Sequence, residues 1–181
     1  MRDRIPHQPE NLCETAPMRV LILADTHAPR RWKGVPEGLR EPLARADVIL
    51  HAGDVCTPEV LDDLGAYAPV HVVLGNNDGP AVAAWGAPET LELMLAGVRV
   101  AMIHDSGTRD GRGRRMRRRF PDADLVIYGH SHIPYDGVDA GVHLFNPGSP
   151  TDRRRQPVGT YGELVLADGI VVSHEILPLP G

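Results

Sequence analysis

The sequence contains few of the residues that hold small secreted domains together or carry a chain into a membrane. There are two cysteines, Cys13 and Cys56, which are too few for a disulfide framework. No apolar run approaches the roughly 20 residues that span a bilayer. The stretch at residues 1–17 lacks the apolar core of a secretion signal. These absences predict a cytoplasmic protein.

Aromatic residues and lysine are also scarce. Aromatic residues make up 4% of the chain, so a platform for stacking nucleic-acid bases is not expected. Lysine occurs once, at Lys33, among 19 basic residues, and the net charge of −5 argues against a general nucleic-acid or membrane-surface binder. Positive charge is concentrated in a run of seven arginines between Arg109 and Arg119 and in a second cluster at Arg153, Arg154 and Arg155.

The composition otherwise is that of a globular protein, with 42% hydrophobic and 24% charged residues in 181 positions. Residues 1–17 are polar, contain three prolines and show no hydrophobic period, which predicts a flexible tail. Residues 18–181 predict a single domain, because no linker or internal repeat interrupts them.

Short apolar runs alternate with helix-like stretches along this domain. Five runs predict strands buried on both faces: Arg19–Ala24, Asp47–His51, Val70–Leu74, Val98–Ile103 and Asp124–Tyr128. The predicted helices are Glu37–Ala46 (interrupted or kinked at Pro42), Pro58–Tyr67 and Gly111–Phe120. Two hairpins are expected, Thr90–Leu95 with Val98–Ile103 and Thr160–Ala167 with Ile170–Leu177. This pattern predicts an α/β fold of two mixed β-sheets sandwiched between helices.

Side chains able to bind a metal follow the carboxyl end of each buried strand. Ligands of open α/β sheets bind beyond these ends, so the pattern predicts one shared site. Its members would be Asp25, His27, Asp54, Asn76, His104, His130 and His132.

This set offers two carboxylates, one amide oxygen and four imidazoles. Such oxygen and imidazole donors suit Mn²⁺, Fe, Zn²⁺, Co²⁺ or Ni²⁺. Seven ligands are too many for one tetrahedral ion but fit two ions that share a bridging carboxylate. Glycines precede three of the ligands, at Gly53, Gly75 and Gly129, where the missing side chain would let the backbone turn tightly beside the metals.

The order of these motifs resembles that of the calcineurin-like metallophosphoesterase superfamily. The motifs are Asp-x-His, Gly-Asp, Gly-Asn, His and Gly-His-x-His, and all occur here in that order between Asp25 and His132. The run from Asn146 to Ser149 is similar to that of the compact single-domain bacterial phosphodiesterases of the group. The resemblance extends from Met18 to about Leu177 and implies the αββα sandwich of that superfamily.

The resemblance also implies a role for each ligand. Asp25, His27 and His132 would hold one divalent ion, and Asp54 would bridge it to a second. Asn76, His104 and His130 would hold that second ion, with Mn²⁺ the first expectation for both. A hydroxide bridging two ions would attack phosphorus in line. The expected activity is therefore that of a metal-dependent phosphoesterase, and of a phosphodiesterase first.

One position departs from the superfamily pattern. Many members carry Gly-Asn-His, and the histidine helps protonate the leaving group. Asn77 stands there in this chain, and an amide cannot act as a general acid. We therefore expect weak activity on esters with poor leaving groups and better activity on phosphodiesters or activated esters. Asp54, Asn76 and Asn77 are the residues expected nearest to the reaction.

Two other functions are compatible with the sequence. The superfamily includes a retromer subunit whose metal-site face serves assembly, so a protein-interaction scaffold with little or no turnover is the alternative; retention of every metal ligand argues against it. The superfamily also includes DNA-repair nucleases, which the short chain and net charge of −5 disfavour. The expected partner is a small phosphoester substrate, not nucleic acid or a membrane.

For most other histidines, cysteines and arginines, the sequence predicts structural, packing or surface roles. Strand alternation gives His51 a structural role, and the arginine run predicts the solvated face of a helix. Cys56 is expected to be a small packing residue, and Arg30 and Arg31 lie close enough in sequence to the first motif to reach a substrate. The predicted surface or packing histidines are His71, His143 and His174.

Overall fold

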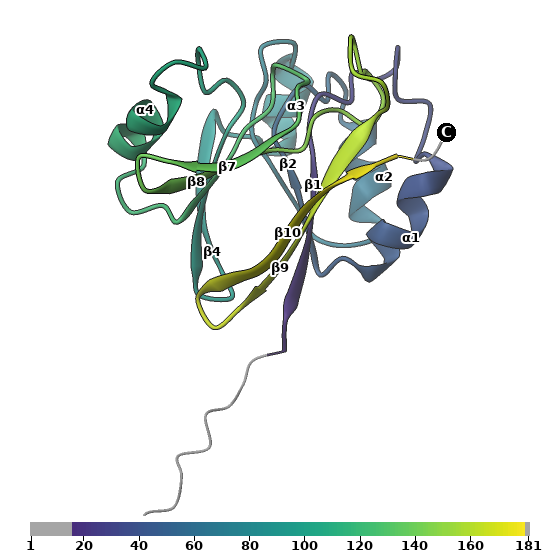
Figure 1. The fold of residues 1–181 in the computed structure, drawn as a ribbon. Coiled ribbons are helices and arrows are strands. Elements are labelled where there is room, and N and C mark those ends of the chain that lie inside the picture. Colours follow the sequence, from purple (N-terminus) through teal and green to yellow (C-terminus); the bar gives the residue numbers. More distant parts are fainter. Residues whose placement is uncertain (1–15, 180–181) are drawn as a thin grey trace, which may run out of the picture.

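The protein is a sandwich of two five-stranded sheets in the computed structural model, which describes residues 16–179 (Figure 1). All but the last two positions of the predicted N-terminal tail lie outside the described residues. The first sheet has the order β10-β9-β1-β2-β3. Its strands are β1 (Met18–Leu23), β2 (Val48–His51), β3 (Val70–Val72), β9 (Thr160–Ala167) and β10 (Ile170–Pro178).

The second sheet has the order β4-β5-β6-β8-β7. Its strands are β4 (Thr90–Leu95), β5 (Val98–Ile103), β6 (Leu125–Ile127), β7 (Tyr135–Asp139) and β8 (Val142–Asn146). Both sheets are mixed: β1 runs parallel to β2 and antiparallel to β9, and β6 runs parallel to β5 and β8, whereas β7 runs antiparallel to β8. The predicted fold class is confirmed.

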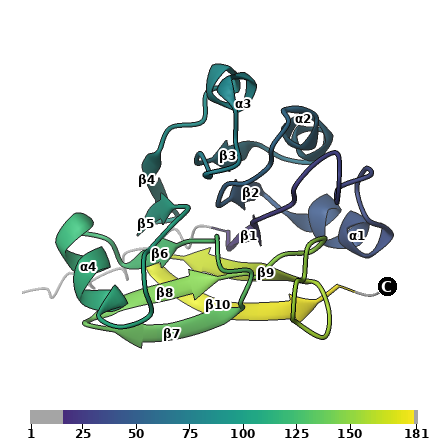
Figure 2. The same cartoon turned by 90° about the horizontal axis from the view of Figure 1, so that it is seen from above.

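In residues 16–179, four helices cover the outer faces of the sandwich (Figure 2). They are α1 (Glu37–Arg45), α2 (Glu59–Gly65), α3 (Pro80–Trp85) and α4 (Arg112–Arg119). The first three pack on the sheet that contains β1, and α4 packs on the other sheet. None of the helices in the described range 16–179 is both long and apolar enough to cross a membrane.

Strand β1 is apolar from Val20 to Leu23 because both of its faces are covered there. Val20 and Ile22 pack into the core between the sheets, whereas Leu21 and Leu23 pack against the helices. Because alternate side chains of a strand point to opposite faces, a strand between two apolar layers must be apolar throughout.

One prediction of local structure needs correction, and two features were not predicted. Helix α1 is not interrupted at Pro42, whose ring is buried within the helix. Helix α3 and the β7–β8 hairpin were not expected from the sequence. Helix α3 has only six residues, too few to show a hydrophobic period. Strand β7 is an edge strand with Gly137 at its centre, between Asp136 and the exposed Val138.

The arginine run forms α4, with Met116 and Phe120 buried as predicted. However, three of its arginines are not simply solvated. Arg115 and Arg117 donate to backbone carbonyls of neighbouring loops, and Arg112 donates to the Tyr128 hydroxyl at 2.8 Å. These contacts anchor the helix to the second sheet.

Candidate metal centre

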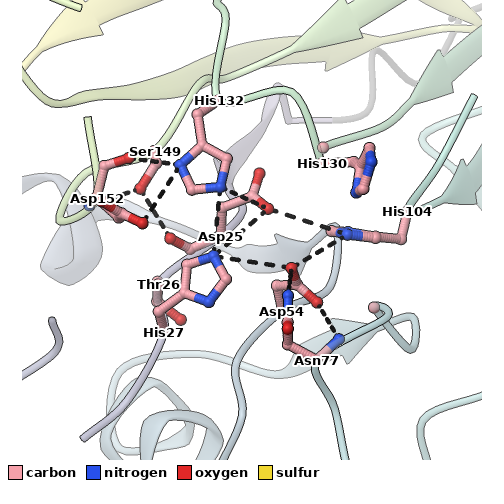
Figure 3. Close-up of polar contacts among 12 residues, drawn as sticks. Asp25, Thr26, His27, Asp54, Asn77, His104, His130, His132, Ser149 and Asp152 are labelled. Atoms are coloured by element: carbon pink, nitrogen blue, oxygen red, sulfur yellow. Dashed lines mark hydrogen bonds and ion pairs between the residues drawn. The ribbon is translucent and has the colours of Figure 1, made fainter. Parts of the chain in front are cut away.

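The strand ends carry all seven predicted ligands to one place. Figure 3 shows the two aspartates and the four histidines of this set. Asp25 and His27 follow β1, and Asp54 lies in the loop after β2. Backbone hydrogen bonds join these two loops, because His27 N–H donates to the Asp54 carbonyl at 3.0 Å. The remaining ligands follow the next strands: Asn76 after β3, His104 after β5, and His130 and His132 after β6.

The ligand atoms lie in two overlapping groups that share Asp25. In the first, His132 Nε2 lies 3.4 Å from Asp25 Oδ1 and 3.3 Å from His27 Nε2. In the second, His104 Nε2 lies 3.4 Å from Asp54 Oδ2 and 4.0 Å from Asp25 Oδ1. Asp54 Oδ2 is also 3.7 Å from His27 Nε2, so both carboxylates lie between histidines of the two groups.

Asn76 joins the site through its side-chain oxygen. This atom lies 2.8 Å from His130 Nδ1 and 3.1 Å from His104 Nε2. Asn76 and His130 are exposed, whereas His104 and His132 are buried. The centre therefore has a buried floor and opens to solvent on the side of Asn76 and His130.

Backbone carbonyls set the orientation of two imidazoles. His104 Nδ1 lies 2.7 Å from the Ala52 carbonyl, and His132 Nδ1 lies 2.5 Å from the Asp152 carbonyl. A carbonyl can only accept, so Nδ1 carries the proton in both rings. In the neutral ring Nε2 is then a lone-pair donor aimed at the centre, which is how metal-binding histidines are held.

The Asp25 carboxylate is the least compensated group of the site. Both of its oxygens are buried without a hydrogen-bond partner. Burial raises the pKa of Asp25 from 3.8 to about 7, and the charge of Asp54 adds to this effect, while His104 opposes it. A buried carboxylate that lacks donors is unfavourable unless a cation neutralises it. Asp25 therefore fits a metal ligand.

The pKa of Asp54 is shifted in the opposite direction to that of Asp25. Burial acts to raise the pKa of Asp54, but hydrogen bonds from His104 and Asn77 outweigh it and leave the pKa below its usual range. Asn77 supplies two of these bonds, from its backbone N–H at 2.8 Å and its side-chain amide at 2.7 Å. Asp54 is therefore ionised and held in a fixed orientation.

The pKa shifts of the histidines also differ in direction. Burial lowers the pKa of His27 and of His132, which keeps these imidazoles in the neutral form that binds metals. Burial also acts on His104, but its hydrogen bond to Asp54 and the charge of Asp25 outweigh burial and raise the pKa of His104.

The loops are shaped around these side chains. Five of the seven predicted ligands have positive φ angles, between 50° and 68°, which are uncommon outside glycine; they are Asp25, His27, Asp54, His130 and His132. The expected close approach of glycine is seen at Gly75, where a Cβ atom would lie 2.2 Å from Asp54 Oδ1. Such local strain at clustered polar residues indicates a functional site.

Two aspartates support the ligands without lying among them. Asp78 accepts hydrogen bonds from the backbone N–H groups of Asp54 at 2.9 Å, Cys56 at 2.6 Å and Gly75 at 2.8 Å. It therefore joins the loop after β2 to the loop after β3. Its place in the Asn-Asp-Gly run after β3 is the only sequence signal for this role. Asp152 acts through its backbone carbonyl, which any residue could supply, so its contact with His132 has no sequence signal.

Other residues singled out in the sequence lie beside the centre. His51 is buried, as a structural role requires; it is hydrogen bonded to the Thr26 hydroxyl at 3.1 Å, and burial lowers its pKa to about 3. Cys56 does contact a predicted ligand, because its Sγ lies 3.5 Å from His27 Nδ1. Burial raises the pKa of this thiol to about 11, so the thiol is protonated when no metal is bound. Arg31 pairs with Asp152 at 3.4 Å.

Comparisons with known proteins show similarity at the level of family and fold. Residues 18–169 match the family model of the calcineurin-like phosphoesterase superfamily domain. A probable metallophosphoesterase of Methanothermobacter thermautotrophicus is 33% identical over 138 residues, which cover 74% of this chain and 78% of that protein.

Solved structures share the fold. Vacuolar protein sorting 29 (Vps29) from Cryptosporidium parvum matches with a TM-score of 0.72 and 21% identity, over 90% of this chain and 98% of that one. Vps29 from Entamoeba histolytica, solved in complex with Zn²⁺, matches with a TM-score of 0.68 and 27% identity, over 90% of this chain and 100% of that one.

Proposed function

Because the chain belongs to the calcineurin-like phosphoesterase superfamily, we propose that it is a cytoplasmic, metal-dependent phosphodiesterase that acts on small substrates. The observation that carries this proposal is the buried Asp25 carboxylate, which lacks any hydrogen-bond donor and lies among the side chains of His27, His104 and His132. A centre with this imbalance of charge needs cations.

The ligand groups suggest how two divalent ions would be held. Asp25, His27 and His132 would hold one ion, and Asp54 would bridge to the other. Asn76, His104 and His130 would complete the second site. Bound ions of this kind acidify water and neutralise the charge that develops on phosphate oxygens. The mixture of oxygen and imidazole donors fits Mn²⁺ first, and also Fe, Zn²⁺, Co²⁺ or Ni²⁺.

The surroundings of the centre support a substrate with two ester arms. A hollow of about 380 Å³ opens beside Asn76 and His104, and its charged lining residues are Arg119, Glu89 and Asp105. Arg119 is exposed, so its guanidinium is accessible to the phosphate group of a substrate. One arm of a phosphodiester could occupy this hollow while the other faces solvent.

The test of the proposal is hydrolysis of bis(p-nitrophenyl) phosphate by metal-stripped protein with and without Mn²⁺. We expect turnover only with the metal. Absence of turnover with Mn²⁺, Fe²⁺, Co²⁺ and Zn²⁺, despite bound metal, would contradict an enzymatic role. It would favour the second candidate, a protein-interaction scaffold, which the similarity to Vps29 keeps in view.

Asn77 is expected to limit the range of leaving groups. Asn77 holds Asp54 through hydrogen bonds from its backbone N–H and its side-chain amide, but that amide has no acidic proton to give to a departing alkoxide. Aryl diesters should therefore be hydrolysed much faster than alkyl phosphomonoesters. The Asn77→His variant should raise the alkyl rate by about 10²-fold, at the lower end of general-acid contributions, with little change for aryl esters.

The comparison requires kcat for both substrate classes in each variant. Asn77→Gln is the matched control, because it changes the side chain but adds no acid. Equal rates on alkyl monoesters and aryl diesters in the natural protein, or an unchanged ratio in Asn77→His, would contradict this role of Asn77.

A further inference from the structure

A second cluster of metal-binding side chains lies apart from the centre described above. It consists of Asp136 on β7, His143 on β8 and His174 on β10. His143 Nε2 lies 2.6 Å from Asp136 Oδ1, and His174 Nδ1 lies 2.5 Å from Asp136 Oδ2. The two imidazole centroids are 4.7 Å apart. The sequence predicts ordinary packing or surface roles for both histidines, and only strand order brings them together.

The cluster joins the edges of the two sheets. Strand β10 is the edge of one sheet and β7 is the edge of the other, and Figure 2 shows β7, β8 and β10 on the same side of the sandwich. Asp136 pairs with Phe145 across the β7–β8 ladder, so it shares a face with His143, two residues from Phe145. Phe145 belongs to the core between the sheets. Asp136 and His143 therefore point inward at the rim of the sandwich.

His174 reaches the same place from the opposite sheet. It lies two residues before Ile176, which packs against the core between the sheets, so both side chains point inward. His143 and Asp136 have exposed side-chain fractions of 14% and 23%, whereas His174 is exposed to 46%. Solvent can therefore reach the cluster from the side of His174, while the other two members are partly enclosed.

The chemistry of the cluster is that of a borderline divalent cation. Two imidazoles and one carboxylate, with water in the fourth position, are a common zinc ligand set. Ligand atoms around a tetrahedral zinc ion lie about 3.3 Å apart, given bonds of about 2.0–2.1 Å. The nitrogen–oxygen distances in the cluster are 2.6 Å and 2.5 Å, so each would have to increase by less than about 1 Å to hold such an ion. In residues 16–179, the ion pairs of Asp136 are with these two histidines alone, so no arginine or lysine neutralises it.

We propose that Asp136, His143 and His174 bind one divalent cation of the zinc type, which clamps the open edges of the two sheets together. This site shares no residue with the centre that carries the proposed activity. Its occupancy is expected to stabilise the fold and to leave phosphodiester hydrolysis unchanged.

Metal content after equilibrium dialysis against Zn²⁺ tests the proposal. His174→Ala and Asp136→Asn should each bind one equivalent of zinc less than the natural protein. His71→Ala is the matched control, because His71 lies on β3 and belongs to none of the ligand groups found in the described residues. His174 is exposed, so its replacement leaves the core intact, and thermal unfolding verifies that each variant is folded.

A second measurement identifies the ligands directly. Titration with Zn²⁺, followed by ¹H–¹⁵N spectra of the imidazoles, should shift the signals of His143 and His174 but leave that of His71 in place. The same zinc should raise the melting temperature of the natural protein by roughly 5 °C and that of His174→Ala by less. Equal zinc content in all variants, with unshifted His143 and His174 signals, would overturn the site and leave a hydrogen-bonded contact between sheets. Neither readout depends on turnover, so failure here is distinct from failure of the proposed enzyme.

Discussion

Asp54→Asn is expected to lower kcat for bis(p-nitrophenyl) phosphate by roughly 10³-fold or more in the presence of Mn²⁺. Asp54 Oδ2 lies 3.4 Å from His104 Nε2 and 3.7 Å from His27 Nε2, so this carboxylate stands between the two ligand groups. Asparagine has nearly the same shape but carries no charge. It would leave the imidazoles in place and remove the anion that would hold two cations close together.

The rate and the bound metal should be measured on the same samples. Metal analysis separates a variant that has lost an ion from one that holds its metal but no longer turns over. Asp122→Asn is the matched control, since Asp122 is exposed in the loop between α4 and β6 and its replacement changes the net charge equally. A fully metal-loaded Asp54→Asn protein with natural kcat would contradict the bridging role of Asp54.

Asp25→Asn is expected to have opposite effects on stability in metal-free and metal-loaded protein. Burial raises the pKa of Asp25 from 3.8 to about 7, so between these values the folded state binds a proton that the unfolded state does not. The destabilisation from this carboxylate is therefore complete above pH 7 and disappears as the pH falls toward 3.8. At pH 8, asparagine should raise the free energy of unfolding of metal-free protein by about 1–3 kcal/mol, after allowing for its own unpaired amide.

At pH 5 the advantage of Asp25→Asn should shrink, because Asp25 of the natural protein is then largely protonated. With Mn²⁺ at pH 8 the order should reverse, since the metal stabilises the carboxylate form and the amide binds it more weakly. Thermal or urea unfolding at pH 5 and pH 8, with and without Mn²⁺, measures all four differences.

Asp122→Asn again serves as the control and should show no such reversal, because Asp122 is exposed. Destabilisation of metal-free protein by Asp25→Asn at pH 8 would contradict this account. It would mean that the Asp25 carboxylate forms stabilising contacts of its own when no cation is present.

The local sequence predicted eight of the ten strands in residues 16–179, and it predicted which side chains would gather at the candidate metal centre. The run from Val20 to Ala24 is apolar because β1 is covered on both faces, and that pattern is visible without a structure. The polar residues after β1, β2, β3, β5 and β6 could be expected to meet, because strands of this kind direct their carboxyl ends to one site.

The supporting contacts of the centre and the second histidine cluster depend on the tertiary structure, because they join segments that are distant in the sequence. Asp78 holds the loop of Asp54 through backbone amides, and Asp152 orients His132 through a carbonyl; neither contact requires a distinctive pattern of side chains. In the sequence, β9 lies between His143 and His174, and the two rings meet because the β7–β8 hairpin of one sheet comes close to the edge strand β10 of the other. Short-range hydrophobic periods report which face of an element is buried, but they do not specify which other element covers it.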